Sequence, residues 1–393
     1  MNLQALIDPI KEYLVQVRRH LHQNPELSLY EYKTAEYLEK ELSSFGIETR
    51  RIGDTGVLGT IQGGQGSGKT ILLRADIDAL PIQEETGLAY QSANKGVMHA
   101  CGHDVHTAAL LGAAKALQQN KDSFAGRVLL AFQQAEEFGS GSRYFVREGI
   151  PQRADRVFGI HVWPEFKAGI VAVGKGTDAA SCDFFRIEVQ GKAAHISKPH
   201  LGVDAVYIAS QIVIELKALV RELVNPFETA LVGVGKIQGG TTYNIVAETA
   251  QLEGTIRALS TQTQALLKQK IEETAASVAQ RHGGTATTSY ESFTSVLVNN
   301  ETAWQEVSEV ARQLVGEENV VVDRTNIMGL AGDDFSEFAK ETKGVYAHVG
   351  IANDNNPNTS LPLHSAKFEV DETALPVAAG LHVGYALWFL GQK

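Results

Sequence analysis

The sequence predicts an α/β protein in which a catalytic domain with a helix-covered mixed sheet is interrupted by a smaller α+β domain. In residues 1–180 and again in residues 298–393, mostly apolar strand patterns alternate with helical patterns, which is typical of a sheet covered on both faces. In residues 181–297 the strands instead alternate polar with apolar residues, as in a single sheet with one open face. We therefore expect a discontinuous first domain (1–180 and 298–393) and an inserted second domain (181–297).

The first domain begins with two helical patterns. Apolar residues at helical spacing run from Leu3 to Leu21 and end before Pro25, and a second pattern over 33–45 ends at Gly46. Helical stretches near 104–119 and 140–148 then separate strands, and the apolar strand patterns are at 57–62, 70–76, 127–133 and 156–162. The glycine-rich segment between the first two strands indicates a hairpin turn.

The inserted domain has its own pattern. Strands at 184–190 and 250–258 alternate in polarity, and two long helical stretches cover about 203–223 and 261–281. A helix over 371–390 ends the chain.

Length, charge and composition exclude several classes of function. The 393 residues suffice for two or three domains of about 150 residues each. The formal net charge of −11 would repel nucleic acid, and we expect no such partner. No apolar run approaches the ~18 residues of a membrane span, and the acidic residues near the start do not suit a signal peptide, so we expect a cytoplasmic protein without a membrane partner. Two cysteines provide no disulfide framework.

One motif suggests a nucleotide but lacks the required context. Gly63, Gly68, Lys69 and Thr70 satisfy the phosphate-loop pattern. A phosphate loop must be followed by a helix whose N-terminus faces the phosphates, whereas the segment ILLRAD that follows here is typical of a strand. We therefore predict a turn rather than a nucleotide site.

The segment MHACGHDVHTA (98–108) is rich in metal-ligand types. It contains His99, Cys101, His103, Asp104 and His106 directly before an apolar helix. A thiolate and an imidazole two residues apart can bind one ion, and this pair suits zinc-like metals. The alternative is a buried cysteine among unrelated histidines.

Further candidates follow the ends of strands, where sites in α/β proteins collect. Glu136 and Glu137 follow 127–133, and His161 ends the next strand. Adjacent carboxylates can divide the work, because one can bind metal while the other transfers protons. Helix capping by the glutamates and a core role for the histidine remain alternatives.

Two aspartates end another strand. Asp76 or Asp78 could hold a ligating imidazole through its second nitrogen, although turn capping competes, especially for Asp76.

In the inserted domain, His195 follows a strand, and Thr242, Asn244 and Arg257 offer polar groups that could bind a carboxylate. An exposed ion pair is the alternative for Arg257.

Several segments occur together in an order that resembles a known family. They are RADIDALP, MHACGHDVHTA, AEE followed by glycines, GIHVWP, GKAAHIS, YNIV, GTIR, GDDFS and LHSAKF, over nearly the whole chain. The sequence resembles the bacterial N-acyl-L-amino acid amidohydrolases, which include hippurate hydrolases and plant auxin-conjugate hydrolases, in the di-metal aminoacylase and carboxypeptidase superfamily. Asp333 and Ala366 depart from residues common in that family, which bears on the loops around the pocket.

The resemblance implies the roles of the site residues by position. The implied metal ligands are Cys101, His103, Glu137, His161 and His364. Five ligands suit two divalent ions (Zn, Mn, Co or Ni), and we expect Cys101 to bridge them, with Glu137 and His364 on one ion and His103 and His161 on the other. The resemblance further implies Glu136 as the general base and Asp78 as the residue that orients the site.

The inserted domain is implied to act as a lid and in dimerisation. His195, Asn244 and Arg257 match residues that meet the scissile carbonyl and the substrate carboxylate. An inserted domain with an open sheet edge also favours pairing with a second copy. We expect a homodimer, or a larger homo-oligomer, in which His195 acts in the partner's site.

The implied reaction is metal-dependent hydrolysis of N-acyl-L-amino acids, with N-acetyl or aromatic acyl groups, to a carboxylic acid and a free amino acid. Glu136 would take a proton from metal-activated water and deliver it to the departing amine. A di-metal carboxypeptidase or dipeptidase would use the same chemistry and is the alternative. A catalytically silent metal-binding protein would lack the base, and Glu136 is present.

Overall fold

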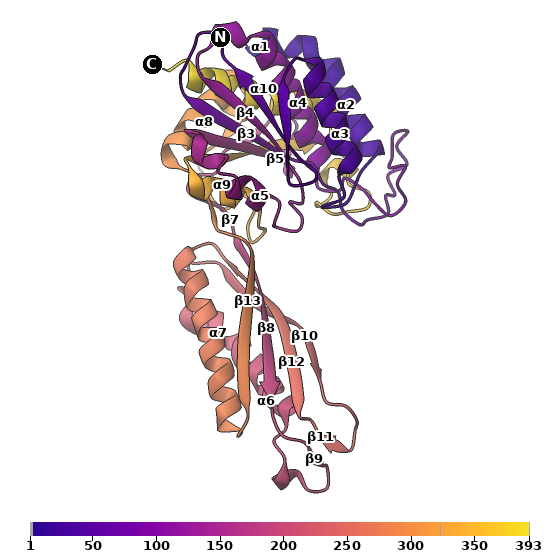
Figure 1. The fold of residues 1–393 in the computed structure, drawn as a ribbon, viewed down its shortest axis with the longest axis vertical. Helices are drawn as coiled ribbons and strands as arrows, with labels where there is room; N and C mark the ends of the chain where they lie inside the picture. Colours follow the sequence, from indigo (N-terminus) through magenta and orange to yellow (C-terminus); the bar gives the residue numbers. More distant parts are fainter. Residues whose placement is uncertain (1–2, 323, 393) are drawn as a thin grey trace. The chain divides into compact units, whose positions relative to one another are not determined.

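The computed structural model describes residues 3–322 and 324–392, which divide into two compact units (Figure 1). The first unit comprises Met1–Gly176, Val298–Ile327 and Asp334–Lys393. The second comprises Thr177–Leu297 and Met328–Asp333. The predicted boundaries at 180/181 and 297/298 lie within a few residues of these, whereas the sequence did not indicate that the short segment 328–333 joins the second unit.

The first unit contains an eight-stranded sheet in the order β1-β2-β4-β3-β5-β16-β6-β15. The strands are β1 (Glu48–Ile52), β2 (Gly56–Gln62), β3 (Thr70–Asp76), β4 (Arg127–Gln133), β5 (Arg156–Lys167), β6 (Val171–Ala172), β15 (Val320–Val321) and β16 (Gly344–Ala352). The four central strands β4, β3, β5 and β16 run parallel, and β1 and β2 are antiparallel to their neighbours. This confirms the predicted α/β class with a mixed sheet. The carboxyl ends of the parallel strands share one edge.

Helices pack on both faces of this sheet (Figure 1). They are α1 (Leu3–Ile7), α2 (Lys11–Gln23), α3 (Tyr32–Ser44), α4 (His103–Gln119), α5 (Ser142–Arg147), α8 (Glu301–Val315), α9 (Phe335–Glu341) and α10 (Leu375–Leu390). Alternate β3 residues Ile71 and Leu73 join the apolar core shared with α4 and α10. On α9, Phe335 stacks on Tyr346 of β16 with ring centroids 4.7 Å apart.

The predicted hairpin between β2 and β3 is wrong, although the segment is a turn and not a phosphate loop. β4 lies between the two strands, antiparallel to β2 and parallel to β3. The connecting segment crosses the start of β4, where the amide of Gly63 donates to the carbonyl of Gly126 (2.9 Å) and the amide of Gly126 donates to that of Gly66 (2.9 Å). A Cβ on Gly68 would lie 2.9 Å from the Gly126 nitrogen, so the glycines permit this close crossing.

The C-terminal helix was expected, but its apolar character was underestimated. The window Glu372–Leu390 is long and apolar enough to cross a membrane by length and composition, and 78% of it is buried inside the protein. α10 packs against α4 and α8, which is typical of the central helix of a globular core.

The second unit is a four-stranded antiparallel sheet with two helices. The sheet order is β10-β12-β8-β13, and the strands are β8 (Ser181–Gln190), β10 (Ala230–Gly239), β12 (Thr249–Ala258) and β13 (Thr285–Thr294). Inward residues such as Ile187 and Leu252 pack on α6 (Ala205–Leu223) and α7 (Thr261–Arg281). Asp204 and Ser260 cap these helices by accepting from backbone amides of their first turns.

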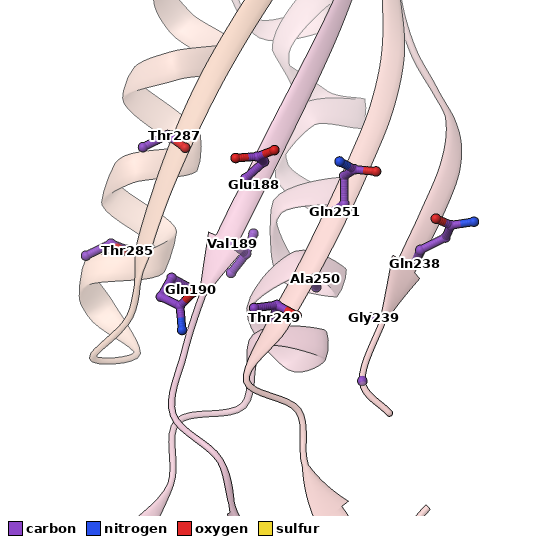
Figure 2. Close-up of a pocket in the computed structure, with 11 residues that line it drawn as sticks. Glu188, Val189, Gln190, Gln238, Gly239, Thr249, Ala250, Gln251, Thr285 and Thr287 are labelled. Atoms are coloured by element: carbon purple, nitrogen blue, oxygen red, sulfur yellow. The ribbon is translucent and has the colours of Figure 1, made fainter. Parts of the chain in front are cut away.

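Polar side chains occupy the other face of this sheet. Figure 2 shows Glu188, Gln190 and Gln251 projecting from neighbouring strands around a hollow of about 590 Å³. Two further short strands, β9 (Ala194–His195) and β11 (Ile245–Val246), pair with each other. β7 (Thr177–Ala179) and β14 (Leu297–Val298) stand at the two ends of the insertion.

Candidate metal centre

A glycine allows the CGHD segment to approach β5. Gly102 has φ +83° and directly precedes α4, so Cys101 and His103 flank a left-handed residue. A Cβ at this position would lie 2.3 Å from Cγ2 of Val162. Only glycine combines this backbone with this contact, and the result is that Cys101 and His103 lie beside His161 on β5.

In two histidines, a backbone oxygen holds the Nδ1 atom of the ring and leaves Nε2 facing the site. Nδ1 of His103 donates to the backbone oxygen of Asp78 (3.0 Å) and lies 3.2 Å from its carboxylate. Nδ1 of His161 donates to the Val162 carbonyl (2.7 Å). Since a carbonyl oxygen can only accept, each ring has a proton on Nδ1, and Nε2 is the nitrogen through which each ring could bind a metal ion.

The predicted ligands form two clusters that share Cys101. In the cluster Cys101, His103 and His161, and also in the cluster Cys101, Glu137 and His364, the potential ligand atoms all lie within 4.8 Å of one another. Sγ of Cys101 is 3.5 Å from Nε2 of His161. Oε1 of Glu137 is 3.4 Å from Nε2 of His364.

Two buried atoms between these clusters lack a hydrogen-bond partner. They are Nε2 of His103 and Oε1 of Glu137, which lie 4.0 Å apart. Leaving such groups unpaired in the interior is costly unless an ion or water satisfies them. The thiolate, imidazole and carboxylate donors suit divalent transition metals, so the residues fit a two-metal centre.

The electrostatic field of the site favours a cation. Burial lowers the pKa of His103, but Asp76, Asp78 and Glu137 together raise it to about 10. Burial and the charge of Glu137 raise the pKa of the Cys101 thiol well above its usual value. A divalent ion would supply the positive charge that protons bound to these side chains otherwise provide.

Backbone strain is concentrated beside the two carboxylates and the last histidine. Ala135 (φ 52°) separates the end of β4 from Glu136, and His364 itself has φ 68°. The amide of His364 donates to the carbonyl of Ala100 (2.8 Å), which joins the C-terminal loop to the CGHD segment. Non-glycine residues in this backbone region are uncommon and cluster at functional sites.

His106 lies beside the centre but is not a ligand. Its Nδ1 lies 2.6 Å from a carboxylate oxygen of Asp76, and its Nε2 accepts from the Val162 amide (2.9 Å). Because both nitrogens are used, His106 is a support for β5, and Asp76 is its partner. The spacing of the histidines in the sequence could not separate this role from that of a ligand.

Glu136 is nearly buried beside the predicted ligands. Behind it lies a group of hydrogen-bonded residues that the sequence did not reveal. The Asp334 amide lies 3.4 Å from Oε1 of Glu136. The Asp334 carboxylate accepts from Nη2 of Arg74 (2.9 Å) and from the Ser142 amide (2.9 Å). The one available signal was Arg74 itself, a charged residue in an otherwise apolar strand pattern, which is fully buried here.

The remaining predicted site residues belong to the second unit. His195 is on β9, opposite Ile245 of β11, and the carbonyl of Asn244 accepts from the Ile196 amide (3.0 Å). Arg257 is at the other end of β12, paired with Cys182 of β8. The β9-β11 pair lies beyond the Thr249 end of β12 (Figure 1), so roughly 25 Å of strand separates Arg257 from His195 and Asn244.

A cavity of about 670 Å³ in the first unit is lined by residues that neighbour two of the predicted ligands in the sequence. Its lining combines apolar residues with three charged ones: Trp163, Pro164, Glu165, Lys167, Ala352, Asp354, Ser360, Pro362 and Leu363. Trp163 follows His161 by two residues on β5 and therefore shares its face of the strand, with ring centroids 6.0 Å apart. Leu363 directly precedes His364. One lining residue thus neighbours a member of each cluster, although no predicted ligand itself lines the cavity.

Comparison with known proteins identifies the family of the chain. The model of peptidase family M20/M25/M40 matches residues 72–387. The chain belongs to this family. Among similar proteins, the N-acetyl-L-cysteine deacetylase of Bacillus subtilis (strain 168) is 38% identical over 370 residues, 94% of this chain and 86% of that protein. Thermostable carboxypeptidase 2 of Saccharolobus solfataricus is 35% identical over 388 residues, 98% of this chain and 97% of that protein.

A solved M20 structure is similar over the whole chain. The YXEP protein of Bacillus subtilis, described as a dinuclear metal binding peptidase from the M20 family, is 30% identical, with a TM-score of 0.85 over 98% of this chain and 100% of that one. The expected resemblance to the aminoacylase branch of di-metal hydrolases is thereby confirmed.

Proposed function

We propose that this protein hydrolyses the amide bond of N-acyl-L-amino acids in the cytoplasm, with two divalent metal ions as cofactors. The observation that carries the proposal is the pair of ligand clusters joined through Cys101, with the carboxyl group of Glu136 beside them. The similarity to an N-acetyl-L-cysteine deacetylase supports this substrate class.

The residues divide the chemistry between them. When bound, two divalent ions lower the pKa of water from ~15.7 toward ~7 and stabilise negative charge on the carbonyl oxygen. Cys101, which belongs to both clusters, would contribute to holding both ions, with Glu137 and His364 holding one and His103 and His161 holding the other. Glu136 takes the proton from the attacking water and returns it to the departing amine. Asp78 holds the His103 ring in place through its Nδ1.

A substrate panel tests this function. Chelated protein is reloaded with Mn, Co, Ni or Zn and assayed with N-acetyl amino acids, N-benzoyl amino acids and dipeptides. Preferential release from the acyl substrates supports the proposal. Preferential cleavage of dipeptides would instead support the carboxypeptidase or dipeptidase alternative. That alternative is kept because the chain is also similar to a carboxypeptidase. Release from none would contradict both.

The distances in the second unit support catalysis across a dimer. An N-acyl amino acid is too short to span the roughly 25 Å of strand between Arg257 and Asn244 of one chain. We infer that the two residues meet in one site only when Asn244 and His195 come from a partner subunit. The edge strand β10 and the adjacent helix α6 carry exposed apolar residues that a second copy would cover: Val206, Tyr207, Ile214, Leu223, Leu231 and Ile237.

Mixing two inactive variants tests this arrangement. His195→Ala and Glu136→Gln are combined under conditions that allow subunit exchange. Each mixed dimer then has one site with both residues intact, and about a quarter of wild-type activity is expected after complete mixing. Exchange demonstrated by native mass spectrometry without recovered activity would place His195 in the site of its own chain, or outside catalysis.

The cavity beside His161 and His364 is proposed to receive the acyl group, since Arg257 and Asn244 bind the opposite end of the substrate. Ser360→Trp places an indole at its exposed rim. We expect kcat/KM for N-benzoyl substrates to fall about tenfold or more while N-acetyl substrates change less than about twofold, because lost pocket space discriminates by ~1–3 kcal/mol.

Asn355→Trp is the matched control for this variant. Asn355 is exposed in the same loop region but does not line the cavity. A similar decrease for both acyl groups in Ser360→Trp, or the same selectivity change in Asn355→Trp, would exclude this cavity as the acyl site.

A further inference from the structure

A carboxyl group remote from the ligands holds the turn that carries Glu136. Glu31 lies just before α3 and is completely buried. Its Oε1 accepts from the Ala135 amide (2.9 Å), and its Oε2 accepts from the hydroxyl of Thr55 (2.7 Å). Ala135 is the residue with φ 52° that precedes Glu136. A buried acidic side chain therefore stabilises an unfavourable backbone conformation next to the base.

A second carboxylate holds the other side of the same turn. Oδ2 of Asp78 accepts from the Glu137 amide (3.1 Å) and from the hydroxyl of Ser28 (2.6 Å). The backbone amides before and after Glu136 are thus each bound to a buried carboxylate. Ser28 and Glu31 both come from the short connection between α2 and α3, so this connection supports the turn at two points.

We propose that Glu31 is a positioning residue for Glu136: by accepting the Ala135 amide it keeps Ala135 in the left-handed conformation that aims the general base. The proposal rests on the proposed function, in which Glu136 is the base. An alanine without this acceptor would relax toward the more favourable right-handed or extended regions, and the following side chain would turn with it.

Asp78 differs from Glu31 because it also contacts the His103 ring. Removal of Asp78 would therefore disturb a ligand and the turn together. Outside its own residue, the carboxyl group of Glu31 accepts from Ala135 and Thr55, and neither is a predicted ligand. Glu31 is accordingly the residue through which the position of Glu136 can be changed while the ligand set is kept.

The test compares two substitutions of similar shape. Glu31→Gln keeps an oxygen that accepts from Ala135, and its amide can donate to the hydroxyl of Thr55. Glu31→Met fills the same space without any acceptor. We expect Glu31→Met to lower kcat about 10²-fold, as a misplacement of about 1 Å does, with metal content and KM changed less than about twofold. Glu31→Gln should restore most of kcat. Thr55→Val, which leaves the Ala135 contact intact, is the control and should retain kcat.

A second measurement does not depend on activity. Hydrogen exchange of the Ala135 amide in metal-free protein should be faster in Glu31→Met than in wild type and near wild type in Glu31→Gln. Parallel loss of kcat and metal, equal kcat in Glu31→Met and Glu31→Gln, or unchanged exchange would each overturn the proposal. If Glu31→Met does not fold, a Glu31→Gln variant with fast exchange would overturn it. Failure of the proposed function would instead appear as wild-type protein that hydrolyses no N-acyl substrate while the exchange difference persists.

Discussion

Glu136→Gln is expected to lower kcat about 10²- to 10⁴-fold, the usual contribution of a positioned general acid-base group, with no loss of metal. Glu136 is nearly buried beside both clusters, and glutamine preserves its shape and its contact near the Asp334 amide. Proton transfer is lost because an amide cannot accept and return a proton. Single-turnover kinetics and elemental analysis of the same sample provide the measurement.

Glu137→Gln is the matched comparison. Oε1 of Glu137 is buried without a hydrogen-bond partner and lies 3.4 Å from Nε2 of His364, as a ligand would. This variant should lose metal during dialysis against a weak chelator, whereas Glu136→Gln keeps it. The opposite result would mean that the roles of the two glutamates are exchanged.

Cys101→Ala is expected to weaken metal binding by more than the ~10–100-fold typical of an outer-layer substitution, because Cys101 belongs to both clusters. Activity should fall in parallel. Metal content after dialysis over a series of free-metal concentrations measures the effect.

Cys182→Ala is the control for this substitution. Cys182 lies on β8 of the second unit, opposite Arg257, and contributes to neither cluster. It should retain metal and at least most of its activity. Equal metal loss in the two cysteine variants would refute the bridging role of Cys101.

Local patterns in the sequence predicted what local geometry determines. The fold class follows from the alternation of apolar strands with helices, and the CGHD segment follows from ligand types at close spacing. The pairing of β2 with β4 instead of β3 was not predictable from those patterns, because the order of strands depends on which apolar faces meet in three dimensions. The segment 328–333 joins the second unit for the same kind of reason.

The supporting layer of the site was the least predictable part. Glu31 and Arg74 are separated from Ala135 and Asp334 by long stretches of chain. Arg74 stands out only as a charge in a mostly apolar strand pattern, and nothing in the sequence distinguishes Glu31 from a surface charge. Only the fold shows that both are buried. His106 shows the converse limit, since a residue type and spacing typical of a ligand serve instead to bind the Val162 amide of β5, while Asp76 of β3 contacts the other ring nitrogen.

Main-chain oxygens of Val162 and Asp78 contact the two imidazoles of one cluster, and for His161 the main-chain oxygen holds Nδ1 without the side-chain contact that the Asp78 carboxylate adds at His103. Side-chain replacement cannot delete a main-chain oxygen, so this part of the centre is buffered against mutation. The turn carrying Glu136 depends instead on two removable side chains, Glu31 and Asp78. Random mutagenesis of the residues that support the ligands and Glu136 should therefore yield more variants that retain metal without turnover than variants that lose metal. A genetic screen for metal retention alone would overlook most of the inactive variants.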